Sequence, residues 1–208
     1  DSYTVSHLFI VNLQGTDMKR IVITLILGTL SFMTSATSWK VDNEASDINF
    51  ITTKKVNFSE VHEFKEFSGS LNDKGEFELA IDLASVWTNV AIRDTRMREM
   101  LFEVASFPKL MLKAQISLTA FAKISIGSSA LMQIDGNVSF HDKTQTVPMT
   151  VSVIRLNENE LIVVSTKPVI INADQFGLSR GVEKLREIAG LTSIGHSVPV
   201  SFMLNLTR

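Results

Sequence analysis

The sequence predicts a single all-β domain, an antiparallel barrel or sandwich of about eight strands with two short helical inserts. Three observations carry this prediction. Apolar and polar residues alternate over several stretches, short polar turn sequences separate those stretches, and helical spacing is confined to two segments. Alternation with a period of two places the apolar residues of a stretch on one face of a sheet.

The N-terminal region predicts export. A cationic pair follows Met18, an apolar run extends to Met33, and small residues occupy positions 35–38. A cationic head, an apolar core of about 7–15 residues and a small-residue cleavage site are typical of a secretory signal peptide, with an uncleaved anchor as the alternative. We therefore expect a periplasmic protein in three parts: 1–17 as a non-native upstream extension, 18–38 as a cleaved signal peptide, and 39–208 as one domain.

The alternation defines five apolar faces, each expected to point toward a common interior. In chain order these faces comprise Phe77, Leu79, Ile81 and Leu83; Leu110, Leu112, Ala114, Ile116 and Leu118; Met132, Ile134, Gly136, Val138 and Phe140; Val147, Met149, Val151 and Val153; and Val198, Val200, Phe202, Leu204 and Leu206.

Polar turn sequences separate these stretches: "NDKG" at 72–75, "HDKTQ" at 141–145 and "NENE" at 157–160. Each could join two neighbouring strands as an antiparallel hairpin. No internal repeat or domain linker is visible, and one domain is expected. The apolar final stretch "VPVSFMLNL" suits either a central strand or the edge of a homodimer.

The first helical segment is "RDTRMREMLFEVASFP". Apolar residues fall at the spacing i, i+3, i+4, i+7, which predicts a short amphipathic helix; they are Met97, Met100, Leu101 and Val104. Asp94 is expected as its N-cap, and Pro108 limits its continuation. We expect this helix at one end of the barrel, with its arginines on the polar side.

The second helical segment is "FGLSRGVEKLREIAGL". Val182, Leu185 and Ala189 form its apolar stripe. Ser179 is the expected N-cap, and Gly190 is the expected residue just beyond the C-terminus.

Composition excludes several functional classes. A net charge of −2 and a pI near 6.1 give no basic footprint for nucleic acid. The absence of cysteine excludes disulfides, thiolate metal sites and a cysteine nucleophile. The sequence has no G-x-S-x-G, P-loop or G-x-G-x-x-G motif. Nothing in these patterns argues for catalysis, and we expect no cofactor and no metal.

The histidines of the expected domain do not form a metal-binding motif. His62, His141 and His196 are far apart in sequence. His62 and His196 are interpreted as surface or hydrogen-bonded residues, and His141 as the head of a turn.

The apolar composition leaves two alternatives for the interior of the barrel: a core filled by side chains, or a cavity that holds a ligand. The sequence contains thirteen Phe and eight Met, but only two Trp and one Tyr. Phe and Met make an apolar interior without demanding hydrogen bonds, and Met adapts to a flexible guest. An eight-stranded barrel is either filled by its side chains or holds one small ligand.

Several motifs together resemble the YceI-like family of small bacterial proteins. They are "WKVDNEASDINFITTK", "HEFKEFSGSL", "SVWTNVAIRDTRMREMLF", "ASFPKL", "IDGNVSFHDKTQTVPMTV", "FGLSRGVEKL" and "SVPVSFMLNL", in this order through most of 39–208. The resemblance implies an extended, lipocalin-like antiparallel barrel and a secreted or periplasmic location. It also implies that the barrel carries a polyisoprenoid chain, such as a quinone or a prenyl phosphate, because some members of the family resemble carriers of such ligands.

From this we expect a ligand entrance at the helical end of the barrel. Expected apolar contacts to the ligand are Phe102, Phe107, Phe140, Phe176, Leu178 and Met132. Arg93 and Arg180 are the chief candidates to contact the headgroup, with Arg96, Arg98 and Lys184 as further donors. For Arg93 and Asp94 the alternative is a structural salt bridge or helix cap.

Three functions remain open on the sequence alone. The first is a carrier of a lipid, an isoprenoid quinone or another apolar small molecule, without catalysis. The second is a stress-response or interaction module with a filled barrel that binds a protein partner. The third is an enzyme acting on an apolar substrate, which would require a titratable cluster inside a cavity.

Overall fold

The protein is described by a computed structural model over residues 38–208. The expected upstream extension and nearly all of the expected signal peptide lie outside the described residues. In chain order the elements are β1 (Trp39–Lys54), β2 (Phe58–Phe64), β3 (Phe67–Leu71), β4 (Glu76–Asp82), η1 (Leu83–Ser85), β5 (Val86–Trp87), α1 (Ala91–Arg96), η2 (Met97–Leu101), β6 (Lys109–Gln115), α2 (Leu118–Ala122), β7 (Ser129–Phe140), β8 (Lys143–Arg155), β9 (Glu160–Ser165), β10 (Val169–Asn172), η3 (Ala173–Phe176), α3 (Ser179–Ile188) and β11 (Ser197–Thr207).

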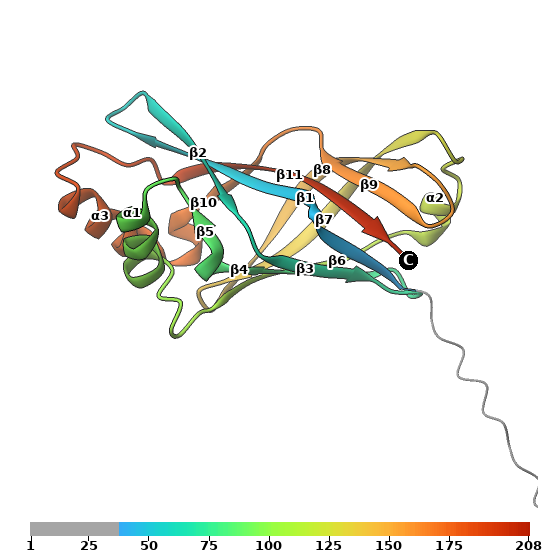
Figure 1. Cartoon of the computed structure of the whole chain (residues 1–208), viewed down its shortest axis with the longest axis horizontal. Coiled ribbons are helices and arrows are strands. Elements are labelled where there is room, and N and C mark those ends of the chain that lie inside the picture. Colours follow the sequence, from blue (N-terminus) through green and yellow to red (C-terminus); the bar gives the residue numbers. More distant parts are fainter. Residues whose placement is uncertain (1–37) are drawn as a thin grey trace, which may run out of the picture. The chain divides into compact units, whose positions relative to one another are not determined.

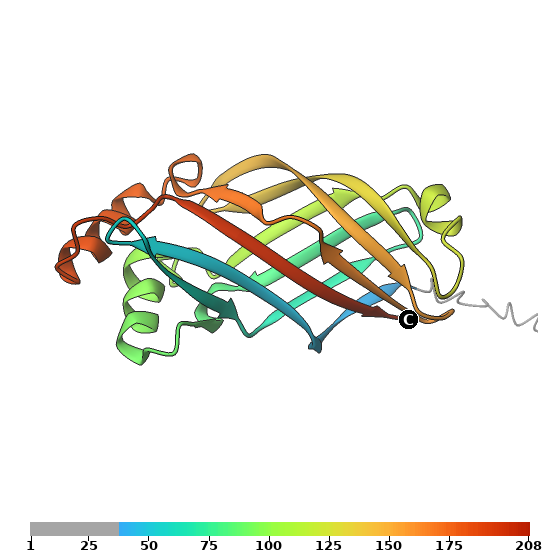
Figure 2. The same ribbon diagram turned by 90° about the horizontal axis from the view of Figure 1, so that it is seen from above.

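Eight antiparallel strands close into a barrel, which confirms the predicted fold class (Figures 1 and 2). Their order is β1-β3-β4-β6-β7-β8-β9-β11, and β11 pairs with β1 to close the ring. The closing register runs from Lys40 opposite Thr207 to Phe50 opposite Val200, with an irregularity between Asp42 and Asp47. Closure leaves no strand edge within this ring unpaired.

Three further strands extend the barrel at one end. β2 pairs with the C-terminal half of β1, β5 pairs with β2, and β10 pairs with the N-terminal part of β11. This is the end that carries α1, η2 and α3, whereas α2 lies at the opposite end (Figure 1). The two ends of the barrel are therefore built differently.

The three expected hairpins are present. The "NDKG" turn joins β3 to β4, and "NENE" lies between β8 and β9. The turn between β7 and β8 is shorter than the expected segment 141–145, because Phe140 already pairs with Lys143. His141 and Asp142 both have positive φ, 51° and 61°, as a two-residue hairpin loop of type I′ requires.

The predicted apolar faces point into the barrel, and nearly all of their residues line its interior. Two residues at the ends of these faces differ from the prediction. Leu83 lies in the 3₁₀ turn η1, because the Asp82 carboxylate accepts a hydrogen bond from the Ala84 N–H. Leu118 begins α2, a helix that the sequence analysis did not predict, because the Ser117 hydroxyl accepts from the Ala120 N–H.

The expected N-cap role of Asp94 is wrong. α1 begins at Ala91, since the Val90 carbonyl already accepts hydrogen bonds from the N–H groups of Arg93 and Asp94. Asp94 therefore lies in the first turn, and its carboxylate accepts from the N–H (2.9 Å) and the hydroxyl (2.5 Å) of Thr88. The residue fastens the preceding loop to the helix.

The second helix agrees more closely with its prediction. α3 starts at Ser179 with Leu178 as N-cap, one residue earlier than expected, and the Ser179 hydroxyl donates to the Asp174 carboxylate instead. Gly190 follows the C-cap with a φ of +62°, the left-handed conformation that glycine adopts without strain. Among the described residues, no helix combines the length and hydropathy needed to cross a bilayer.

Close packing of α3 on η2 depends on Gly181. A Cβ atom at this position would lie 2.8 Å from the Met100 carbonyl oxygen and 2.9 Å from the Leu101 Cα, both of which are backbone atoms. Gly181→Ala should lower the free energy of unfolding by about 1–3 kcal/mol, because overpacking outweighs the better helix propensity of alanine.

Urea denaturation checks this prediction, with Gly195→Ala as the control. A Cβ at Gly195 would meet its nearest atom, the Thr53 carbonyl oxygen, at 3.5 Å, an ordinary contact. Equal stability of the two variants would contradict the close-packing argument.

Candidate ligand cavity and its polar end

A cavity of about 360 Å³ lies inside the barrel, within the usual range of roughly 300–1,000 Å³ for small-molecule sites. Its wall is formed almost entirely by aliphatic, phenylalanine and methionine side chains from the barrel strands. Among the described residues that line it, the polar or charged ones are Thr52, Lys54, Glu60, His62, Arg93 and Arg96.

These polar residues come from β1, β2 and α1, the elements at the helical end. The cavity is therefore apolar along the barrel and polar at one end. At the other end α2 contributes Phe121 to the wall, and this ring packs edge-on against Trp39 with centroids 5.9 Å apart. Ile124, just after α2, is buried beside it.

Four of the six expected apolar contacts line the cavity: Phe102, Phe140, Leu178 and Met132. The other two do not. Phe107 packs against the ring of His141, with centroids 4.1 Å apart, and the fully buried Phe176 packs behind Phe140. The ligand-binding role of the four wall residues stays a prediction.

The two arginines expected to contact the headgroup lie in different places in the structure. Arg93 lines the polar end of the cavity, as does the further candidate Arg96. Arg180 is exposed and lies outside the wall. The reason is helical geometry: Val182 and Leu185 of α3 face the cavity, and a residue two positions before Val182 points to the opposite side.

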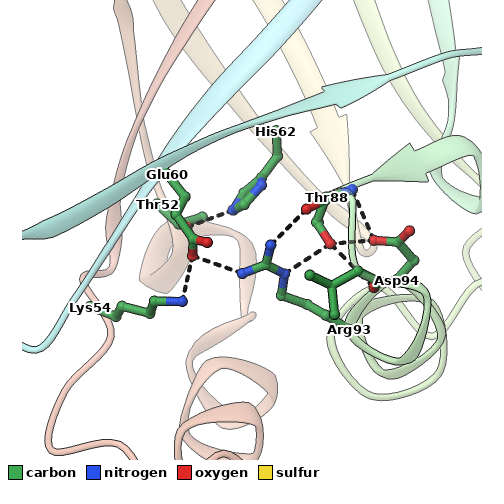
Figure 3. Close-up of polar contacts among 8 residues, drawn as sticks. Thr52, Lys54, Glu60, His62, Thr88, Arg93 and Asp94 are labelled. Atoms are coloured by element: carbon green, nitrogen blue, oxygen red, sulfur yellow. Dashed lines mark hydrogen bonds and ion pairs between the residues drawn. The ribbon is translucent and has the colours of Figure 1, made fainter.

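Arg93 is the centre of a hydrogen-bonded network (Figure 3). Its guanidinium donates to the Glu60 carboxylate at 2.7 Å, and to the hydroxyl and carbonyl oxygens of Thr88 at 2.8 and 2.7 Å. Lys54 forms a second ion pair with the same Glu60 oxygen at 2.5 Å. Arg93 therefore links α1 and its preceding loop to β2. Its guanidinium N–H groups are already hydrogen-bonded to oxygen atoms of Glu60 and Thr88.

Strand register brings these groups together. In the β1–β2 ladder Thr52 pairs with Glu60 and Phe50 with His62, which places these side chains on the inner face. Burial opposes ionisation of Glu60, but hydrogen bonds from Lys54 and Arg93 outweigh it and lower the pKa of the carboxyl. Glu60 is therefore a stable anion that holds two cations.

His62 is the one buried histidine among the described residues, 2% exposed. Its Nε2 lies 2.9 Å from the Thr52 hydroxyl, and its Nδ1 has no hydrogen-bond partner among the described residues. Burial lowers the pKa of the imidazole, and the charge of Arg93 lowers it further. His62 is therefore a neutral ring at the polar end of the cavity, and its Nδ1 is buried and bonded to none of the described residues.

Of the two alternatives for His62, a surface or a hydrogen-bonded residue, the structure confirms the second and places the ring in the interior. A signal was present in "FSEVHEF", where His62 has the same parity as Phe58 and Phe64. That parity places it on the apolar face of the strand. Within residues 38–208, no cluster of three or more His, Asp or Glu residues is placed to hold a metal ion.

The lowered pKa of His62 predicts a pH-dependent stability. The folded-state pKa lies below the 6.5 of an unperturbed histidine, so the unfolded chain binds more protons as pH falls through this value. We expect the free energy of unfolding to decrease from pH 7.5 to 5.5 in the wild type, and to decrease less in His62→Gln. Urea midpoints at three pH values test this, and parallel curves for both proteins would refute it.

Comparison with known proteins agrees with this architecture. A polyisoprenoid binding domain from Saccharophagus degradans superposes with a TM-score of 0.80 at 32% identity, covering 82% of this chain and 98% of that domain. BcnA of Burkholderia cenocepacia shares the fold at 18% identity, with a TM-score of 0.62 over 79% of this chain and 98% of BcnA. A comparison with curated proteins finds no match.

A family model described as the YceI-like domain matches residues 39–206, nearly all of the described chain. This match and the 32% identity to a solved domain confirm the resemblance seen in the motifs. The protein is a member of the YceI-like family.

Proposed function

We propose that the protein is a periplasmic carrier that holds a long apolar ligand, such as a polyisoprenoid quinone, a prenyl phosphate or another lipid, inside its barrel without catalysing a reaction. The observation that carries the proposal is the cavity itself, apolar along the barrel and polar at one end. Burial of each CH₂ group contributes about 0.8 kcal/mol, so several isoprene units bind without directional contacts.

The similar Saccharophagus degradans domain is itself a polyisoprenoid binding domain, which supports a ligand of this class. The unfilled space argues against the alternative of a filled barrel that acts only as an interaction module. At the polar end, Glu60 and Arg93 are bonded to each other and to their neighbours. This arrangement favours a structural role over acid–base chemistry.

Two groups at the polar end are candidates to meet the ligand headgroup. Arg96 lines the cavity and forms no ion pair with any described residue, and the buried Nδ1 of His62 lacks a partner among them. A neutral imidazole and a guanidinium suit an oxygen acceptor, such as a quinone carbonyl or a phosphate. Arg93 is then a positioning residue that fixes α1 beside this headgroup site.

The test of the carrier function is mass spectrometry of the protein purified gently from its host, first intact under native conditions and then after organic extraction. We expect a stoichiometric prenyl quinone, prenyl phosphate or acyl lipid. A protein that is isolated bare and takes up none of these lipids in vitro would contradict the proposal.

The cavity further predicts selection by chain length. Ala114 and Gly136 pair directly in the β6–β7 ladder toward the end covered by α2, and Ala114 lines the wall there. Ala114→Phe should weaken binding of a long prenyl chain at least tenfold, because excluding only two methylene groups already costs about 1.6 kcal/mol. A ligand of two isoprene units should lose less than threefold.

Fluorescence titration with the two ligands measures this difference. The matched control is Lys113→Phe, the same new side chain on the exposed face of the same strand, where Lys113 pairs with Glu78. Equal losses for long and short ligands would show that the chain does not reach this part of the barrel.

A further inference from the structure

Large apolar side chains are exposed around the polar end of the cavity. We call the following five residues the mouth surface: Val56 (84% exposed), Phe58 (54%), Val90 (44%), Ile92 (58%) and Ile188 (42%). They come from the β1–β2 hairpin, the start of α1 and the end of α3, which lie at one end of the barrel (Figures 1 and 2). Single exposed apolar residues are ordinary, whereas a group around a cavity mouth indicates an interaction surface.

The tip of the β1–β2 hairpin presents its valine in a strained conformation. Val56 has a φ of +73°, a left-handed value that is costly for a β-branched residue and that glycine or asparagine adopts more readily. The tip is anchored to the segment after α3 by hydrogen bonds from Lys55 N–H to the Ser193 carbonyl (3.1 Å) and from Gly195 N–H to the Thr53 carbonyl (2.7 Å). Internal packing does not account for a valine here, since its side chain is almost fully exposed.

The mouth surface is continuous with the polar end of the cavity. Phe58 pairs with Lys54 in the ladder, and the Lys54 ammonium lies 5.1 Å from the centre of its ring. Ile92 immediately precedes Arg93, whose guanidinium binds Glu60 beside the cavity. A ligand that passes the polar end therefore passes these exposed apolar side chains.

The unpaired charges of the β1–β2 hairpin tip and of α3 beside this surface are basic. Lys55, Arg180 and Lys184 are exposed and form no ion pair with any described residue. The acidic residues of β2 and α3 near the mouth have basic partners: Glu60 contacts Lys54 and Arg93, Glu63 contacts Lys65, and Glu183 and Glu187 share Arg186.

We propose that the mouth surface docks on a lipid bilayer that contains anionic phospholipids, so that the ligand passes between membrane and cavity without crossing water. The proposal rests on the carrier function, because a prenyl or acyl lipid resides in a membrane. Exposed aliphatic and aromatic side chains enter the interface, and neighbouring lysines and arginines bind anionic headgroups. This combination of apolar tips and unpaired basic groups matches such an interface.

Flotation with vesicles of phosphatidylcholine and phosphatidylglycerol (7:3) tests the docking. We expect the wild-type protein to bind these vesicles, and Val56→Ser combined with Phe58→Ser to bind at least tenfold more weakly. The matched control is Leu131→Ser combined with Leu156→Ser, which removes apolar side chains that are 71% and 39% exposed near α2, at the opposite end of the barrel. The control should bind within twofold of the wild type.

A second assay separates docking from ligand binding. Transfer of a fluorescent prenyl lipid from donor vesicles should be slowed at least fivefold by the Val56 and Phe58 substitutions, while binding of the detergent-solubilised lipid stays unchanged. Ala114→Phe should show the opposite pattern, with normal vesicle binding and weaker uptake of a long chain.

Three results would overturn the docking proposal and leave the carrier function standing. The first is uptake of solubilised lipid by a wild-type protein that does not bind vesicles. The second is an equal loss of vesicle binding in the mouth and control variants. The third is binding to native membranes but not to pure lipid vesicles, which would identify the partner as a protein. Failure to take up any lipid in any format would instead overturn the carrier function.

Discussion

The pairing of β1 with β11 is the interaction on which the rest of the structure depends. It joins the first and last strands of the domain and turns a sheet into a closed ring. In a closed ring the ladder holds the walls at a fixed separation, so the interior cannot collapse to remove unfilled space. A small residue such as Ala114, which lines the cavity, then leaves room inside without loss of its pairing with Gly136.

A second set of interactions connects the elements that extend the barrel at its helical end. The Glu60 carboxylate binds Lys54 from β1 and Arg93 from α1, and so links hairpin and helix at the mouth. The three charges largely satisfy one another. His62, held neutral by its burial and by the nearby arginine, keeps a free nitrogen beside them. The bonded network of Glu60 and Arg93 and the unpaired nitrogen of His62 thus lie side by side at this end of the cavity.

The barrel wall could be predicted from the sequence because strand alternation is a local property. Each run from Phe77 to Leu206 carries its own period of two, and the structure turns those faces inward. The polar network could not be predicted, because Lys54, Glu60, Thr88 and Arg93 meet only through the register of β1 with β2 and the placement of α1. Asp94 was misassigned for the same reason: its sequence position suits a cap, but the Thr88 donors arrive from the preceding loop.

The helix α2 makes the two ends of the barrel different. Phe121 and Trp39 fill one end, while the end beside α1 keeps polar groups facing the cavity. If the barrel carries a ligand with a long tail and a polar head, as proposed, this arrangement would let the tail enter first and the head leave first. Under the proposed carrier function, an acceptor would meet the headgroup before the chain, so recognition of the headgroup would select the acceptor.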